Sequence, residues 1–186
     1  MKVIAIKSKD RCGKDTTAEI IEQQYLDKGM KVVIIPLSRL LKEYIGSVMG
    51  ISLTTVDHLK NDNREIEVHG ETMYMRDYII QTAKLIASNF GEEVLISHVT
   101  NVLKNKLYDV VIIPDIRFRH EYDLLNIYEK IIVIEIISNL DSCGKNGKTY
   151  ELDKIPSDYT LINNYVKNDI YRETLKHNIY NLLKHI

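Results

Sequence analysis

The chain has 186 residues, of which 45% are hydrophobic and 27% are charged, and its formal net charge is -1. Length and composition are those of one globular domain with a full hydrophobic core. The near-neutral charge excludes a general electrostatic attraction to nucleic acid or to a membrane surface, so any binding of phosphate must depend on local basic groups.

The sequence gives no sign of a membrane or secretory protein. No apolar run approaches the roughly 20 residues that span a bilayer, and the N-terminus does not have the pattern of a signal peptide. The two cysteines, Cys12 and Cys143, predict no disulfide framework and fit a reducing cytoplasm. The abundance of Lys, Asn, Ile and Tyr is typical of an AT-rich genome, and a viral source would make this the host cytoplasm. We expect neither a membrane nor a nucleic acid as partner.

The first 49 residues alternate strands with helices. Residues 2–7 form an apolar, β-branched run that predicts a buried strand, and a Gly-containing loop follows. Apolar positions at helical spacing predict a helix over 14–28, which Gly29 ends. A second strand is expected over 31–37, and Ser38 is placed to cap a helix that runs to about residue 49.

Residues 50–105 contain no run that predicts a strand. LTTVDHLKND (53–62) predicts a short helix with Thr54 or Thr55 near its cap, and the polar stretch NDNREIEVHGET (61–72) predicts a loop. Two further helices are expected, one before and one after Gly91. We interpret the whole segment as a helical insert between strands.

The rest of the chain again alternates strands with helices. Strands are predicted over 108–115, 130–137 and 159–163, with a helix over 119–130 and a last helix from about residue 168. The polar stretch 138–158 predicts a loop. Strands that are apolar on both faces and alternate with helices predict a parallel sheet covered by helices on both sides. The insert and the loop are then expected at the carboxyl edge of the sheet, where α/β ligand sites form.

The stretch SKDRCGKDTT (8–17) follows the first strand and is an altered phosphate-binding loop of the Gly-x-x-x-x-Gly-Lys-Ser/Thr type. Ser8 takes the place of the first Gly, and Asp15 takes the place of the hydroxyl residue. Backbone N–H groups at the start of the helix would hold the phosphates of ATP, and Lys14 would bridge its β- and γ-phosphates. The predicted nucleotide-binding residues here are Ser8, Lys9, Asp10, Arg11, Cys12, Gly13, Lys14, Asp15 and Thr16.

Acidic and hydroxyl groups near this loop predict a bound Mg²⁺. Asp15 could ligate the ion directly or through water, Thr16 could supply the missing hydroxyl, and Asp115 lies at the end of a predicted strand. Arg117 follows two residues later and offers a planar fork to phosphate. We therefore expect ATP and Mg²⁺ as cofactors, with Lys14, Asp115 and Arg117 acting in phosphoryl transfer. The alternative is that Asp115 and Arg117 form a strand-end turn closed by a salt bridge.

Taken with three later segments, the loop resembles that of the phage-type deoxynucleoside monophosphate kinases, which are P-loop kinases. The animal phosphomevalonate kinases are similar in the loop. The three segments are SRLLKEYIGSVMGIS (38–52), MRDYIIQTAKLIASNFGEEVLISHV (75–99) and PDIRFRHEYDLL (114–125). The last is the most specific, because a strand ending in Asp-x-Arg-Phe is followed by x-x-Glu on a helix; the matching residues are Asp115, Arg117, Phe118 and Glu121. The end of the family's lid is matched by Glu151, Asp158 and Asn163.

The resemblance implies a three-layer α/β/α P-loop kinase with a five-stranded parallel sheet. The core would comprise residues 1–49, 106–137 and 159–186, with a helical insert over about 50–105 that binds the acceptor monophosphate and a lid over about 138–158. The residues implied to bind the acceptor are Ser38, Lys42, Arg64, Arg76, Gln81 and Glu151, and Asn163 would contact the cofactor. Arg76 would grip the acceptor phosphate and Gln81 its base; alternatively, Arg76 pairs with a surface acid and Gln81 satisfies a buried group.

The implied activity is the ATP-dependent phosphorylation of deoxynucleoside monophosphates to diphosphates, with small nucleotides as partners. Lys145 and Lys148 stand where the family often has lid arginines, and they either close over the transferring phosphoryl group or are simply solvated. Related kinases are often dimers, which makes a homodimer a further expectation. Two alternatives stay open: a kinase for another phosphorylated acceptor, such as phosphomevalonate or dephospho-coenzyme A, and a nucleotide-binding module without catalysis.

Overall fold

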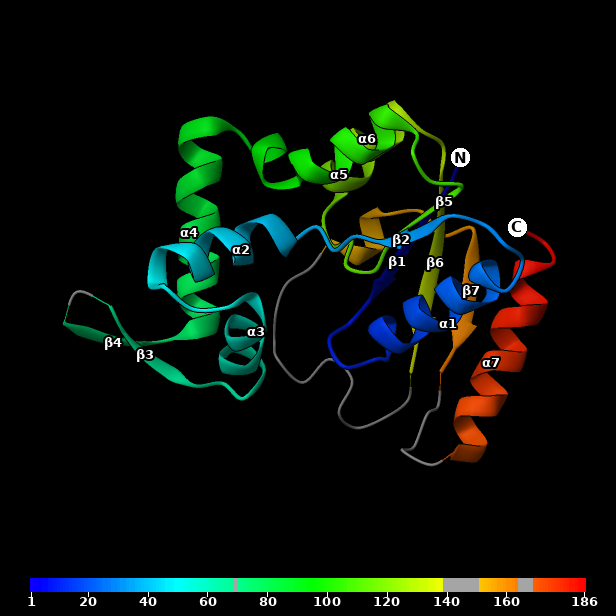
Figure 1. The fold of residues 1–186 in the computed structure, drawn as a ribbon, viewed down its shortest axis with the longest axis horizontal. Helices are drawn as coiled ribbons and strands as arrows, with labels where there is room; N and C mark the ends of the chain where they lie inside the picture. The colour runs from blue at the N-terminus through cyan, green and yellow to red at the C-terminus, as the bar shows by residue number, and fades with distance from the viewer. Residues whose placement is uncertain (69, 139–150, 164–168) are drawn as a thin grey trace. The chain divides into compact units, whose positions relative to one another are not determined.

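The computed structural model describes residues 1–68, 70–138, 151–163 and 169–186. These residues form two compact units, drawn in Figure 1. The first unit comprises Met1–Pro36 with Val99–Ile186, and the second comprises Leu37–His98. The second unit therefore begins earlier and ends earlier than the predicted insert of about 50–105. No helix in the described part of the chain is long and apolar enough to cross a membrane.

A five-stranded sheet forms the centre of the first unit, and every neighbouring pair in it is parallel. The strands follow the order β2-β5-β1-β6-β7. Their bounds are β1 Lys2–Ser8, β2 Val32–Ile34, β5 Val110–Ile113, β6 Ile131–Ile137 and β7 Tyr159–Ile162. The central strand β1 is apolar on both faces and fully buried from Val3 to Ile6. The predicted parallel α/β sheet of five strands is confirmed, with β2 shorter than expected.

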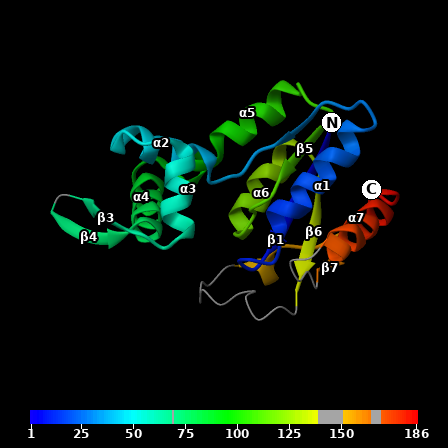
Figure 2. The ribbon, with the colours of Figure 1, turned by 60° about the horizontal axis from the view of Figure 1, so that its bottom comes forward.

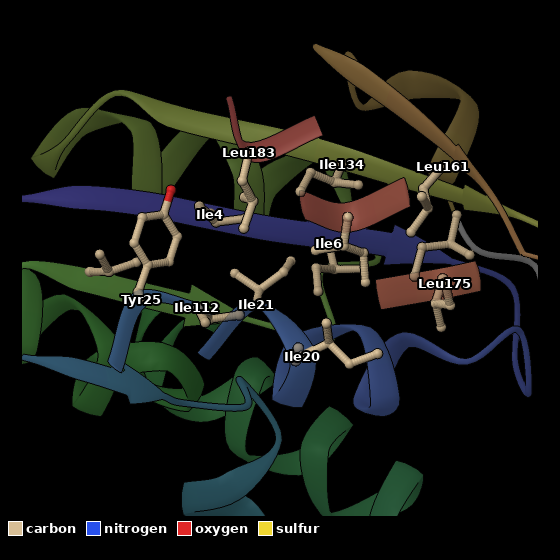
Figure 3. Packing of buried hydrophobic residues seen from close by; sticks show 14 of the residues in the cluster. Ile4, Ile6, Ile20, Ile21, Tyr25, Ile112, Ile134, Leu161, Leu175 and Leu183 are labelled. Carbon is tan, nitrogen blue, oxygen red and sulfur yellow. The ribbon is translucent and has the colours of Figure 1, made fainter. Parts of the chain in front are cut away.

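Helices cover both faces of this sheet. On one face, α1 (Lys14–Leu26) and α7 (Asp169–Leu183) pack their apolar side chains against Ile4 and Ile6, as Figure 3 shows. Successive side chains of a strand point to opposite faces, so the neighbours Val3 and Ala5 face the other side. There α5 (Ser97–Asn105) and α6 (Arg119–Tyr128) complete three layers (Figures 1 and 2). A short 3₁₀ helix, η2 (Leu152–Lys154), precedes β7.

The second unit is built from helices and one hairpin. Its elements are α2 (Arg39–Met49), α3 (Leu53–Asn61), β3 (Glu65–Val68), β4 (Glu71–Tyr74), α4 (Met75–Phe90) and the 3₁₀ helix η1 (Glu92–Ile96). Its core consists of Leu41, Ile45, Val56, Ile66 and Met75. Because the apolar face of α2 contributes to this core, α2 belongs to the second unit and not to the first.

One local prediction in the second unit is wrong. The stretch 61–72 contains strand β3 and the start of β4, which pair antiparallel, instead of a loop. Ile66 is buried and Val68 half-buried between charged neighbours, so a half-buried strand was hidden in a polar sequence. The cap of α3 is Ser52, whose hydroxyl accepts the Thr55 N–H at 3.1 Å, so Thr54 and Thr55 lie near the cap as expected.

Candidate phosphate-binding site

The loop between β1 and α1 has the backbone that a phosphate cradle requires. Gly13 caps α1 in the left-handed conformation, with φ at 87°, and Arg11 is also left-handed at 62°. A side chain on Gly13 would collide with the amide group of Asn163. Glycine is therefore needed at this position for two reasons: the backbone is left-handed, and a Cβ would overlap with the Asn163 amide. The N–H groups of the first turn of α1 are left for an anion, as at other helix N-termini.

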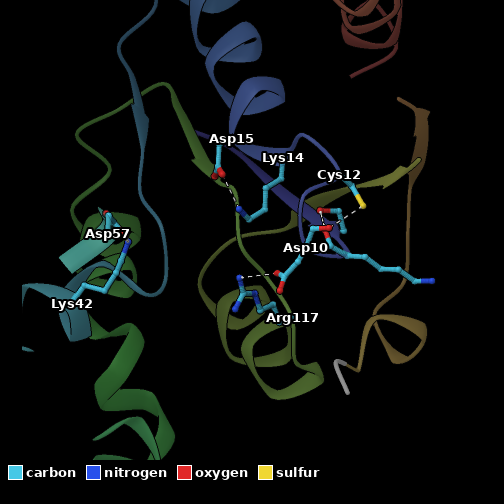
Figure 4. Close-up of polar contacts among 9 residues, drawn as sticks. Asp10, Cys12, Lys14, Asp15, Lys42, Asp57 and Arg117 are labelled. Atoms are coloured by element: carbon cyan, nitrogen blue, oxygen red, sulfur yellow. Dashed lines mark hydrogen bonds and ion pairs between the residues drawn. The ribbon is translucent and has the colours of Figure 1, made fainter. Parts of the chain in front are cut away.

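Lys14 is the first residue of α1, and its side chain is one-fifth exposed. Its Nζ lies 2.8 Å from Oδ2 of Asp15, as Figure 4 shows. Asp15 is exposed and lies in the first turn of the helix, where the helix dipole favours an acid. Asp15 thus neutralises Lys14 in the structure, and an incoming polyphosphate would compete with it for this ammonium group.

The turn after β5 brings a second basic group to the loop. Arg117 Nη2 lies 3.7 Å from Oδ1 of Asp10, which belongs to the loop (Figure 4). Both side chains are partly buried, and Asp115 at the end of β5 is buried. Strands β1 and β5 are paired neighbours, so their carboxyl ends place the loop and this turn side by side. Arg117 thus pairs with Asp10 of the loop, whereas the alternative prediction was a salt bridge within the turn of Asp115 and Arg117.

Glu121 supports the turn that carries Arg117. Its Oε2 accepts the backbone N–H of Arg117 at 2.7 Å and that of Phe118 at 3.0 Å. Burial raises the pKa of Glu121 from 4.5 to about 7, against the lowering effect of these two donors, and the charge of Asp115 raises it further. The sequence identifies Glu121 only through the resemblance. Glu121 stands three residues after the N-cap Phe118 and accepts its N–H, which is one half of a capping box; Phe118 has no side-chain acceptor for the other half.

The described end of the predicted lid, which begins at Glu151, is bonded to the same turn. The N–H of Glu151 donates to the Arg117 carbonyl at 3.1 Å, and Glu151 Oε2 accepts the N–H of Arg119 at 3.2 Å. A hydrogen bond from Lys154, followed by that from Arg119, lowers the pKa of Glu151. Glu151, predicted to bind the acceptor, is thus engaged with the start of α6.

Lys7 is a buried cation that the sequence analysis missed. Its Nζ donates to the carbonyls of Leu152 at 3.0 Å and Ile155 at 2.6 Å, and lies 3.4 Å from Glu135. Lys7 is the residue before Ser8. These contacts therefore hold the segment from Leu152 to Ile155 against β1, the strand that leads into the loop. The side chain is 4% exposed, so its role is to hold this segment and not to contact a ligand.

The remaining loop residues differ in exposure. Ser8 is buried and its hydroxyl donates to the Lys9 carbonyl at 3.0 Å, whereas Lys9 is exposed. Thr16 is half-buried. Cys12 is buried, with its sulfur 3.6 Å from the Asp10 carbonyl oxygen.

No preformed metal centre is present among the described residues, since no three His, Cys, Asp or Glu side chains gather as ligands there. Magnesium commonly binds through one or two protein groups together with substrate phosphates and water. Asp15, Thr16 and Asp115 fit that mode, because Asp15 and Thr16 lie in the first turn of α1 and Asp115 lies two residues after the neighbouring strand β5. Their role as metal ligands stays a prediction.

The acceptor-binding candidates of the second unit have different environments. Lys42 is buried and its Nζ donates to both carboxylate oxygens of Asp57, at 2.8 and 3.2 Å. Arg64 is exposed, and Arg76 is half-buried at the start of α4. Gln81 is exposed, and both predictions for its amide, a base contact and a bond to a buried group, stay predictions. Ser38 precedes α2 without a side-chain capping bond. Lys145 and Lys148 lie outside the described residues.

Two of the three comparisons with known proteins found no match. No family model matches it, and no curated protein matches it. Among solved structures, the APS kinase of Mycobacterium tuberculosis is similar at 13% identity and a TM-score of 0.47, covering 98% of this chain and 96% of that one. The shikimate kinase of Bacteroides thetaiotaomicron has 13% identity and a TM-score of 0.45, covering 98% of each chain.

A third similar structure is a plasmid partition protein of Borrelia burgdorferi, with 19% identity and a TM-score of 0.42, covering 100% of this chain and 99% of that one. Kinases and a partition protein thus have comparable similarity to this chain. At these identities and TM-scores the likeness carries no argument about function, which has to be argued from the residues themselves.

Proposed function

We propose that the chain transfers the γ-phosphate of ATP to a deoxynucleoside monophosphate and so forms the diphosphate. The observation that carries the proposal is the position of Arg117 beside the phosphate-binding loop, 3.7 Å from Asp10. A loop that only binds a nucleotide needs Lys14 and the backbone N–H groups of α1. A second cation at the same place supports a reaction in which negative charge must be neutralised as a phosphoryl group moves.

Each group has a defined task in this proposal. The N–H groups at the start of α1 and the ammonium of Lys14 bind the donor phosphates. Asp15, Thr16 and Asp115 would hold Mg²⁺, which when bound neutralises charge on the donor oxygens. Arg117 neutralises the charge of the transferring group with its guanidinium fork. The acceptor oxygen is already an ionised phosphate, so the protein does not need to supply a general base.

The identity of the acceptor is supported by the sequence of the second unit. Arg76 and Gln81 lie on α4 one and a half turns apart, and they match the Arg and Gln of the deoxynucleoside monophosphate kinases. Arg76 would bind the monophosphate, while the exposed amide of Gln81 would hydrogen-bond a base edge. Lys42 has a weaker claim, because its ammonium is already bound by Asp57.

A coupled ADP-release assay tests the proposal. Each of the four deoxynucleoside monophosphates is supplied in turn with ATP and Mg²⁺, next to phosphomevalonate and dephospho-coenzyme A, and Lys14→Ala is the matched control. Release of ADP that depends on a deoxynucleotide and on Lys14 supports the proposal. Activity on the non-nucleotide acceptors alone would overturn the deoxynucleotide assignment, and ATP binding without transfer to any acceptor would show a binding module.

A further inference from the structure

We infer that Asn163 is a positioning residue for the phosphate-binding loop: it fixes the peptide between Cys12 and Gly13 and thereby aims the Gly13 N–H at the donor phosphate. The inference rests on the proposed function and names a residue that acts through the loop. The resemblance implies instead that Asn163 touches the cofactor. The structure gives its side chain a different partner.

The first step is the hydrogen bond itself. Asn163 Nδ2 donates to the carbonyl of Cys12 at 2.9 Å, in a buried contact between residues 151 positions apart. The side chain is 4% exposed and Cys12 is 1% exposed. A buried hydrogen bond is stronger than an exposed one, because the surroundings have a low dielectric constant. The contact therefore restrains the Cys12 carbonyl tightly.

The second step is the rigidity of the residue that donates. Asn163 directly follows β7, and its own N–H donates to the Ile137 carbonyl at 2.8 Å. Ile137 is the last residue of β6 and pairs with Ile162. The side-chain amide is thus held at the end of two paired strands of the central sheet. A side chain held by paired strands can fix the position of a loop that does not itself take part in the hydrogen bonding of the sheet.

The third step follows from the planarity of the peptide. All peptides of the described chain are trans, and in a trans peptide the C=O and the following N–H point in opposite directions. Fixing the Cys12 carbonyl towards Asn163 therefore directs the Gly13 N–H to the opposite side. Gly13 is the cap of α1, so this N–H belongs to the donors that a helix N-terminus offers to an anion.

The residue types at both positions fit this role. A Cβ on Gly13 would occupy the place of the Asn163 amide, so the two residues are complementary in shape. Aspartate has nearly the same shape as asparagine, but it would turn a carboxylate oxygen towards the Cys12 carbonyl and add a negative charge behind the loop. Alanine would remove the donor without adding a charge. Asn163→Asp is therefore expected to weaken phosphate binding more than Asn163→Ala does.

Binding of ATP and of inorganic tripolyphosphate, measured by calorimetry, tests the inference. For Asn163→Ala we expect the dissociation constants of both ligands to rise by a similar factor, on the order of tenfold. If Asn163 instead contacted the base or sugar, only the ATP constant would rise, which would overturn the inference. The matched control is Asn126→Ala, which removes an asparagine bonded to the Ile131 N–H at 3.2 Å, at the opposite end of β6.

A measurement on the unaltered protein keeps the inference testable if the variants do not fold. The Gly13 amide resonance in a ¹H–¹⁵N spectrum should move downfield when tripolyphosphate is added, since its N–H gains an anionic acceptor. A Gly13 resonance that does not move while tripolyphosphate binds would contradict the inference and leave the proposed function standing. Failure of the unaltered protein to bind either ligand would overturn both. Unchanged affinities in a folded Asn163→Ala would overturn only the inference.

Discussion

Replacing Glu121 with glutamine should stabilise the protein at alkaline pH, because the folded chain places this carboxyl where its charge is unfavourable. Oε2 lies under the turn after β5 and accepts the N–H groups of Arg117 and Phe118. Burial nevertheless raises the pKa of Glu121 to about 7. The amide oxygen of glutamine can accept the same two hydrogen bonds and cannot ionise.

The expected size of the effect follows from the two pKa values. The stabilising contribution of a group with a raised pKa is fully present below the pKa in the unfolded chain, here 4.5, and is lost as the pH rises through the folded-state value of about 7. At about 1.4 kcal/mol for each unit of difference, the loss is about 3 kcal/mol. About 2 kcal/mol of it is expected between pH values of about 5.5 and 8.5.

The assay is urea unfolding, followed by far-UV circular dichroism across that pH range. The free energy of unfolding of the unaltered protein should fall by about 2 kcal/mol more than that of Glu121→Gln. Glu173→Gln is the control, because Glu173 lies on α7, is exposed and bonds only at the surface to Lys176. If the free energies of unfolding of the unaltered protein and of Glu121→Gln changed with pH in parallel, the raised pKa of the Glu121 carboxyl would be refuted.

Three further substitutions test the site. Lys14→Ala should reduce phosphoryl transfer by two orders of magnitude or more. Its circular dichroism spectrum should be retained, because the ammonium of Lys14 pairs with the exposed Asp15 and not with a buried group among the described residues. Near-normal turnover would remove Lys14 from the mechanism. Arg117→Ala should lower kcat much more than the melting temperature, and a loss of stability with kcat intact would show a structural ion pair with Asp10 instead. Asp15→Ser restores the usual hydroxyl and should change the Mg²⁺ and Mn²⁺ dependence of the rate, whereas identical metal titrations would place Asp15 away from the ion.

The sheet could be predicted from sequence because each of its strands is a short apolar run, buried on both faces and bounded by loops. The hairpin of the second unit could not, since Ile66 and Val68 are two apolar residues among glutamates. Strands of this length carry too little periodicity to outweigh their polar neighbours. The cap of α3 could be placed only approximately, because Ser52, Thr54 and Thr55 are all good capping residues and only the backbone decides among them.

The loop and the turn of the candidate site were predicted because each is a local pattern, and parallel neighbouring strands bring their carboxyl ends together. The residues that hold these parts in place were not predicted in that role. Asn163 bonds to Cys12 across 151 positions, and Lys7 bonds to Leu152 across 145. Contacts of such separation depend on which strands become neighbours and on the register between them, and a single sequence does not state either.

The most direct test of the account is the transfer of label from [γ-³²P]ATP, separated by thin-layer chromatography, with each deoxynucleoside monophosphate and Mg²⁺. The account predicts labelled deoxynucleoside diphosphate with at least one base, formed by the unaltered protein and not by Lys14→Ala. Label that remains in ATP or appears only as inorganic phosphate, with all four acceptors present, would contradict it.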